Sequence, residues 1–151
     1  MIANSESAYS QRVKTIKNDG EYLFEKFCQE NNCQYQRLGF DEHQASVPNY
    51  WRLNSIIRNL PDFVINIGNK TYVVAVKGTD KFKKKEIDLL PSMINAYSSK
   101  EAPLIYAFCF KENSGPVWVK PSKIIELYNN AHDEQWHDKV VFRDLKIRNK
   151  K

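Results

Sequence analysis

The sequence has few of the residues that break or cross-link a fold, with only 5 glycines, 6 prolines and 3 cysteines among 151 residues. No Gly/Ser-rich linker, repeat or low-complexity tract interrupts it, which predicts a single domain over residues 1–151. The cysteine count is odd, and Cys28 and Cys33 lack the second Cys or His pair of a zinc site. We therefore expect reduced thiols, and neither a disulfide framework nor a structural zinc ion.

Long apolar runs are also absent. The longest, Ala102–Phe110, is far shorter than the ~20 residues needed to cross a bilayer. The polar N-terminal stretch lacks the apolar core of a signal peptide, so we expect a cytoplasmic location and no membrane partner. The chain has 23 Lys and Arg against 18 Asp and Glu, and this net charge of +5 favours a polyanionic partner.

Hydrophobic periodicity predicts alternating helices and strands. The predicted helices are Glu21–Asn32, Tyr50–Leu60, Lys84–Ser98 and Lys123–Asn130. The predicted strands are Cys33–Leu38, Asp62–Ile67, Thr71–Lys77, Pro103–Phe110, Pro116–Lys120 and Val140–Phe142. This order predicts an α/β fold in which helices flank a central mixed β-sheet, followed by a basic C-terminal tail, Lys146–Lys151.

The strongest chemical signal is a predicted β-hairpin. Its two β-branched runs, Asp62–Ile67 and Thr71–Lys77, flank the short connection Gly68-Asn69-Lys70. Pro61 precedes the aspartate that opens the first run, and a lysine closes the second. An aspartate after a proline, a hairpin and a strand-end lysine occur in this order in many phosphodiester-cleaving sites.

In the second strand, Thr71–Lys77, successive side chains point to opposite faces of the sheet. Position 75 and Lys77 share one face, while Val74 and Val76 point into the core. The Asp62 carboxylate and the Val76 carbonyl are oxygen ligands of the kind that Mg²⁺ prefers. The Lys77 ammonium group is suited to orienting an attacking water and to offsetting charge on a phosphorane.

On these motifs the chain resembles the PD-(D/E)XK nuclease superfamily, which includes restriction endonucleases and Holliday-junction resolvases. The family pattern is a helix with a glutamate, Pro-Asp on one strand and (Asp/Glu)-X-Lys on the next, then a helix and further strands. In this sequence residues 20–27, Pro61-Asp62 and Ala75-Val76-Lys77 correspond, and the resemblance covers roughly Gly20–Lys120.

The resemblance implies a restriction-endonuclease-like fold and an endonuclease that hydrolyses phosphodiester bonds in DNA, with RNA the less favoured substrate. It implies Mg²⁺ as cofactor, with Mn²⁺ as a substitute, held by Asp62, an acid at position 75, the Val76 carbonyl and a helix glutamate. It also implies a homodimer or a higher symmetric homo-oligomer, in which each copy addresses one strand.

One position departs from the family pattern. Ala75 stands where the family has Asp, Glu or sometimes Gln, and alanine has no oxygen to give to a metal. Three explanations stay open: an engineered inactive variant, a natural domain that binds nucleic acid without cutting it, and a carboxylate that has moved, with Glu86 or Asp80 as the nearest candidates. The intact surroundings of position 75 favour the engineered change. We therefore predict an endodeoxyribonuclease in an inactive form, with a non-cleaving nucleic-acid-binding module on the same fold as the alternative.

Two further groups of charged residues complete the predicted site. Glu21 and Glu25 lie one helical turn apart, and Glu21 is preferred because it is nearer the edge of the apolar helix face. The predicted contacts to the DNA backbone are Lys81, Lys83, Lys84, Lys85, Arg52 and Arg58. Each of these charged side chains also fits an ordinary solvated surface.

Overall fold

The computed structural model of the protein describes residues 20–38 and 60–149. The described helices are residues 20–30, α3 (Lys84–Tyr97), α4 (Pro121–Asn130) and the short 3-10 helix η2 (Ile147–Asn149). The described strands are β1 (Gln34–Arg37), β2 (Phe63–Ile67), β3 (Lys70–Lys77), β4 (Lys81–Phe82), β5 (Leu104–Phe108), β6 (Val117–Val119), β7 (Asp133–Gln135) and β8 (Val141–Asp144). Apart from Leu60, the helix predicted over residues 50–60 lies outside the described residues, and so do Arg52 and Arg58.

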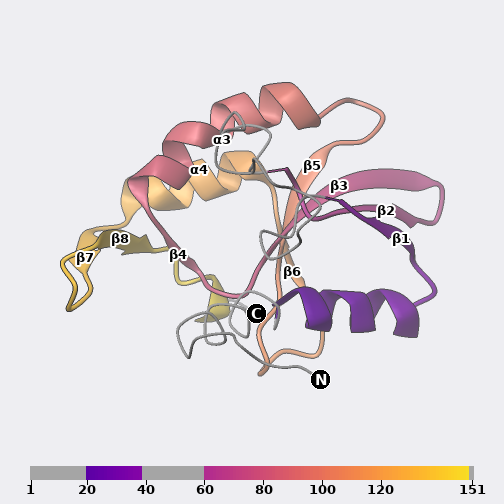
Figure 1. Ribbon diagram of the computed structural model, residues 1–151, viewed down its shortest axis with the longest axis horizontal. Coiled ribbons are helices and arrows are strands. Elements are labelled where there is room, and N and C mark those ends of the chain that lie inside the picture. The colour runs from indigo at the N-terminus through magenta and orange to yellow at the C-terminus, as the bar shows by residue number, and fades with distance from the viewer. Residues whose placement is uncertain (1–19, 39–59, 150–151) are drawn as a thin grey trace, which may run out of the picture.

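These elements form two sheets (Figure 1). The larger is five-stranded, in the order β1-β2-β3-β5-β6, and the smaller is three-stranded, in the order β4-β8-β7. In the larger sheet β3 and β5 run parallel and the other neighbours antiparallel. The helix over residues 20–30 packs on one face of this sheet, and α3 and α4 pack on the other. The predicted mixed sheet flanked by helices is therefore confirmed.

The predicted hairpin is confirmed as β2 and β3. Ile67 pairs with Lys70, which leaves Gly68 and Asn69 as a two-residue turn. Gly68 has a φ of 61°, which glycine adopts without the steric penalty of a Cβ atom. A tight turn fixes the register of a hairpin, so every residue of β3 has a defined neighbour on β2.

Alternation along β3 divides the core into two clusters, one on each face of the sheet. Val74 and Val76 pack on the face covered by residues 20–30, as their predicted core orientation requires. Ala75 lies on the opposite face, beneath α3 and α4. Its methyl group packs against that second cluster, so both faces of β3 are at least partly buried there.

The strand β5 lies at the centre of both clusters. Leu104, Tyr106 and Phe108 are buried on the α3 and α4 side, and Ala107 is buried on the other side. A nearly continuous apolar run predicts burial on both faces, and β5 confirms that prediction.

The sequence predicts only one strand of the smaller sheet, β8. The structure adds β4, inside the stretch predicted as a basic surface, and β7. These strands have two and three residues, too few for a period-2 pattern to be visible. Tertiary packing forms β4, because the Phe82 ring is 2 % exposed and lies 6.1 Å from the Phe108 ring.

The predicted basic tail begins inside the core. Leu145 and Ile147 are buried, and the backbone N–H of Arg148 donates to Asp80 Oδ2 at 3.1 Å. Apolar residues alternate with charged ones here, and the charged ones dominate the composition. Residues 145–148 are therefore a packed part of the fold.

Over the two described ranges, no helix has both the length and the apolar character that crossing a membrane requires.

The close approach of Gly20 to Gly78 gives a test of how the first helix is seated. A Cβ atom at Gly20 would lie 3.1 Å from the nitrogen and 3.2 Å from the Cα of Gly78. Backbone atoms cannot relieve such a contact by a rotamer change, as a side chain can. We expect Gly20→Ala to lower the free energy of unfolding by about 1–3 kcal/mol, measured by urea denaturation. Gly115→Ala is the control, because its Cβ would meet only the Phe27 ring, at 3.6 Å. Equal losses in the two variants would contradict this packing.

The three cysteines are free thiols in different surroundings. Burial raises the pKa of Cys28 and of Cys109 to about 12, whereas Cys33 is partly exposed. Because the thiolate is the reacting form, we expect Ellman's reagent at pH 8 to modify only Cys33 in the folded protein and all three thiols after denaturation. Rapid reaction of all three thiols in the folded protein would contradict the burial of Cys28 and Cys109.

Candidate active site

Lys77, at the end of β3, faces the first turn of α3. Its Nζ lies 3.7 Å from Glu86 Oε1 and 4.7 Å from the centre of the Phe82 ring. A separation of 3.7 Å is an ion pair rather than a hydrogen bond. Within the described chain the Lys77 ammonium group makes no hydrogen bond, so its donors are available to a ligand.

The start of α3 holds Glu86 in place. Glu86 is the third residue of the helix, and its Oε2 accepts a hydrogen bond from the backbone N–H of Lys83 at 3.2 Å. This reach back from the first helical turn is half of a capping box, and it satisfies a backbone donor that the helix leaves unpaired. One carboxylate oxygen therefore caps the helix, and the other faces Lys77.

Asp62 is held by backbone contacts to the strands on both sides. Its N–H donates to the Val74 carbonyl at 2.9 Å, and its own carbonyl accepts from the Leu38 N–H at 2.7 Å. The side-chain Oδ2 accepts from the Val76 N–H, also at 2.7 Å. The carboxylate thus lies against the part of β3 that carries Ala75 and Val76.

The charges of both carboxylates act on Tyr106. It pairs with Ala75 across the parallel strands β3 and β5, and it is almost fully buried. Burial raises the pKa of Tyr106, and the negative charges of Glu86 and Asp62 raise it further. Both carboxylates are therefore near one phenol, and Asp62, Lys77, Glu86 and Tyr106 form what we call the carboxylate–lysine cluster.

Asp80, the second candidate for a moved carboxylate, has a different role. It is 4 % exposed, and besides the Arg148 N–H its carboxylate faces Lys81 Nζ at 3.8 Å. Its backbone carbonyl accepts from the Leu145 N–H at 2.9 Å. Asp80 ties the C-terminal segment to the fold, and only Glu86 of the two candidates faces Lys77.

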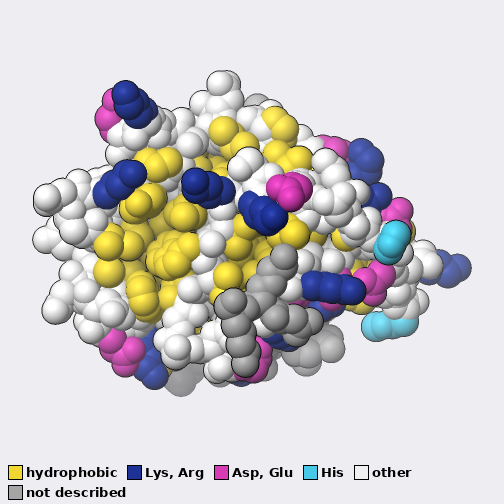
Figure 2. Space-filling model, turned by 180° about the vertical axis from the view of Figure 1, so that it is seen from behind, with side chains coloured by type: hydrophobic (Ala, Val, Ile, Leu, Met, Phe, Trp, Pro, Cys, Tyr) yellow, Lys and Arg dark blue, Asp and Glu magenta, His cyan; other side chains and the backbone are white. Residues whose placement is uncertain are grey.

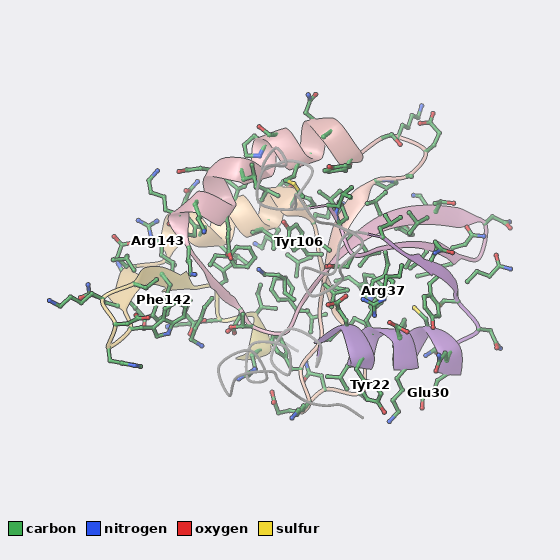
Figure 3. All side chains as sticks on the ribbon, in the orientation of Figure 1. Tyr22, Glu30, Arg37, Tyr106, Phe142 and Arg143 are labelled. Atoms are coloured by element: carbon green, nitrogen blue, oxygen red, sulfur yellow. The ribbon has the colours of Figure 1, made fainter. Side chains whose placement is uncertain are left out.

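Arg37 of β1 lies beside the helix over residues 20–30 (Figure 3), and it joins the glutamates of that helix to β1. Arg37 Nη1 lies 2.5 Å from Glu21 Oε1, Nη2 contacts Glu25, and the guanidinium group lies 5.1 Å from the centre of the Phe63 ring. Partial burial lowers the pKa of Arg37, but the two carboxylates outweigh this and raise it. Glu21 is near the end of β3, since Gly20 touches Gly78, and its charge is already balanced.

The sequence analysis did not identify Arg37. The available signal was its position in the strand predicted over Cys33–Leu38, which is next in the chain to the glutamate helix.

The predicted phosphate-binding lysines do not form one free surface. Lys81 lies 3.8 Å from Asp80 and 3.9 Å from Asp144, and Lys83 Nζ lies 5.9 Å from the centre of the Trp136 ring. Lys84 is 79 % exposed and pairs with Asp88 at 2.9 Å, and Lys85 is exposed. Lys84 and Lys85 are the members most available to a polyanion.

The donor set of the cluster fits a hard cation. Asp62 and Glu86 supply carboxylate oxygens. Val76, which directly precedes Lys77 and whose N–H bonds Asp62, supplies a backbone carbonyl oxygen. The described residues contain no group of three or more His, Cys, Asp and Glu side chains that could enclose a metal. Mg²⁺ commonly uses only one or two carboxylates, with water and substrate phosphates completing its shell, so two are sufficient.

Comparisons of the chain with protein-family models, with curated proteins and with solved structures find no match. What the cluster does must therefore be inferred from its own geometry.

The Arg37 network gives a stability test. Because Arg37 and the 8 % exposed Glu21 are in direct contact, we expect a double-mutant cycle of Arg37→Met and Glu21→Gln to give a coupling energy of about 1–2 kcal/mol by urea denaturation. The exposed pair Lys84–Asp88 is the matched control, with an expected coupling of about 0.3–0.5 kcal/mol. A coupling for Arg37 and Glu21 no larger than the control would show that the contact is a loose surface pair.

Proposed function

We propose that this protein is a Mg²⁺-dependent endodeoxyribonuclease with a restriction-endonuclease-like fold of the PD-(D/E)XK type. In this proposal Glu86 supplies the carboxylate that Ala75 lacks. The observation that carries the proposal is the ion pair between Lys77 of β3 and Glu86 of α3, at 3.7 Å. Lys77 directly follows Val76, whose N–H bonds the Asp62 carboxylate. The chain as it stands would then be active, in contrast to the inactive variant that the sequence alone favours.

The residues of the cluster have distinct tasks in this proposal. Asp62, Glu86 and the Val76 carbonyl would hold the ion, which supplies Lewis-acid polarisation of the phosphate and lowers the pKa of water. Lys77 would orient the attacking water and stabilise the charge that develops on the phosphorus oxygens. The water oxygen bonds to phosphorus as the bond to the 3′ oxygen breaks, which leaves a 5′-phosphate and a 3′-hydroxyl.

Glu21 would act from the edge of the site. Arg37 holds it in the resting protein, and a polyanionic substrate would compete with Glu21 for the guanidinium group. Glu25, which contacts the other terminal nitrogen of the guanidinium group, would position Arg37 rather than touch the substrate.

The expected substrate is DNA, and we infer a homodimer in which each copy addresses one strand. The net charge of +5 supports a polyanion. Lys84 and Lys85 at the start of α3 would contact phosphates beside Glu86, where the N-terminus of a helix also favours negative charge.

A natural nucleic-acid-binding module that does not cut is the second candidate. It is favoured by Ala75 and by the lack of a three-carboxylate group among residues 20–38 and 60–149. In this candidate the lysines and the basic net charge still bind nucleic acid, but the Lys77–Glu86 pair only stabilises the fold.

The test is a cleavage assay with Mg²⁺ on duplex, branched and single-stranded DNA. We expect the unaltered chain to cut at least one substrate, and Glu86→Gln, Asp62→Asn and Lys77→Met to lower the rate by about 100-fold or more, because even outer-shell partners of a metal can contribute that much. Glu126→Gln is the matched control, because Glu126 is also a helix acid paired with an exposed lysine, Lys123, but lies on α4, and we expect its activity to be unchanged.

Ala75→Glu separates the explanations for the missing carboxylate. If Glu86 has taken its role, Ala75→Glu should restore cutting in the Glu86→Gln variant. Cutting by Ala75→Glu alone, with the unaltered chain inert, would show that Glu86 has no such role. Failure of both proteins to cut, with DNA affinity that falls steeply as salt rises, would support the non-cleaving module.

A further inference from the structure

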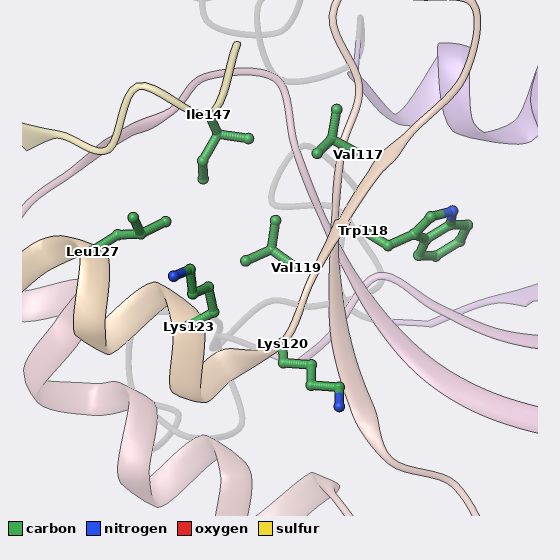
Figure 4. Close-up of a pocket in the computed structure, with 7 residues that line it drawn as sticks. All are labelled: Val117, Trp118, Val119, Lys120, Lys123, Leu127 and Ile147. Carbon is green, nitrogen blue, oxygen red and sulfur yellow. The ribbon is translucent and has the colours of Figure 1, made fainter. Parts of the chain in front are cut away.

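A groove opens beside β6, on the far side of β5 from Asp62 and Lys77. It encloses about 410 Å³ between β6, α4 and the C-terminal segment. Val117, Val119, Leu127 and Ile147 point into it, whereas Trp118 points to the opposite face of the sheet (Figure 4). The space is therefore lined by apolar side chains from three elements far apart in sequence.

The edge of the sheet at this groove is open within the described residues. β6 pairs with β5 on one side, and no other described strand pairs with it. Across the ranges 20–38 and 60–149, no hydrogen bond to the outer edge of residues 117–119 is found. A strand edge with unpaired N–H and C=O groups is a template for an extended backbone, because an added strand satisfies both kinds of group.

The rim of the groove is positively charged. Lys120 and Lys123 line it, and no acidic residue does. Lys120 is exposed with no ion-pair partner among the described residues, while Lys123 pairs with Glu126 at 3.1 Å. Seen from behind, the molecule carries broad hydrophobic areas with Lys or Arg side chains among them (Figure 2).

We propose that this groove binds an extended segment of a partner protein, with apolar and acidic residues in alternation, as a strand added to β6. The backbone of the segment would pair with residues 117–119. Its apolar side chains would enter the space between Val119 and Leu127, and its carboxylates, on the other face of the added strand, would lie near Lys120, while the charge of Lys123 at the rim would add to the attraction.

Charge favours this occupant over a second copy of the chain. Two copies joined edge to edge at β6 would bring the lysines of both edges into one interface, and each copy has a net charge of +5. Lysines beside a short edge strand are a common protection against such self-pairing. The same lysines attract the carboxylates of an acidic segment.

The experiment uses the full chain and a fluorescein-labelled heptapeptide of alternating valine and glutamate. We expect saturable binding by fluorescence anisotropy, lost when the central valine of the peptide is replaced by proline and at least tenfold weaker when its glutamates are replaced by lysines. Shifts of backbone amide resonances on peptide addition should centre on residues 117–127 and 145–148.

Two groove variants and one matched control complete the design. Lys123→Glu and Leu127→Asp should each weaken peptide binding at least tenfold. Lys84→Glu should leave it unchanged, because Lys84 is also an exposed helix lysine paired with an acid, but on α3 outside the groove. Circular dichroism of each variant establishes that it is folded.

Several results would overturn the proposal. These are no binding of the peptide, equal weakening by the groove variants and by Lys84→Glu, and equal binding of the proline-containing peptide. A concentration-dependent dimer that Lys123→Glu and Leu127→Asp abolish would assign the groove to a second copy instead. None of these measurements depends on DNA cleavage, so they leave the proposed nuclease activity to its own test.

Discussion

The parallel pairing of β3 with β5 is the constraint on which the rest of the structure depends. Parallel neighbours need a crossover, and here α3 supplies it, beginning seven residues after β3 ends. The chain must turn back at once, so the first turn of α3 lies over the end of β3. The Lys77–Glu86 pair is a direct consequence of that return.

Electrostatics explains why the cluster holds together in a partly buried position. Two carboxylates close to one phenol repel each other, and partial desolvation makes that repulsion stronger than in water. Lys77 offsets it, and the Phe82 ring beneath the ammonium group adds a cation–π attraction. Each carboxylate also accepts a backbone N–H, from Val76 or from Lys83, and these hydrogen bonds help to fix both acids in place.

Local patterns in the sequence were enough for the large elements and for half of the cluster. The hairpin is predictable because its turn and its β-branched runs are contiguous, and β5 because an apolar run buried on both faces needs no partner to be recognised. Asp62 and Lys77 follow from their positions at the hairpin ends. These features are each set within one short, contiguous stretch of chain.

The remaining features depend on contacts that no local pattern contains. Strand β4 exists because Phe82 packs on Phe108, and Arg37 acts on a glutamate 16 residues away. The sequence offers Glu86 and Asp80 equally as candidates for a moved carboxylate, and only the crossover of α3 turns Glu86 toward Lys77. Ile147 reads as part of a basic tail, although it lines the groove beside β6.

The sheet separates the two proposed activities in space. A strand added to β6 would extend the sheet in its own plane, because backbone pairing runs sideways from an edge. Lys77 lies two strands away from β6, where β3 meets the start of α3, and Tyr106 is the one member of the cluster on the neighbouring strand β5. An acidic segment at β6 would also leave Lys84 and Lys85 for the nucleic acid, since neither lines the groove. Partner binding and phosphodiester hydrolysis are therefore geometrically compatible in one molecule.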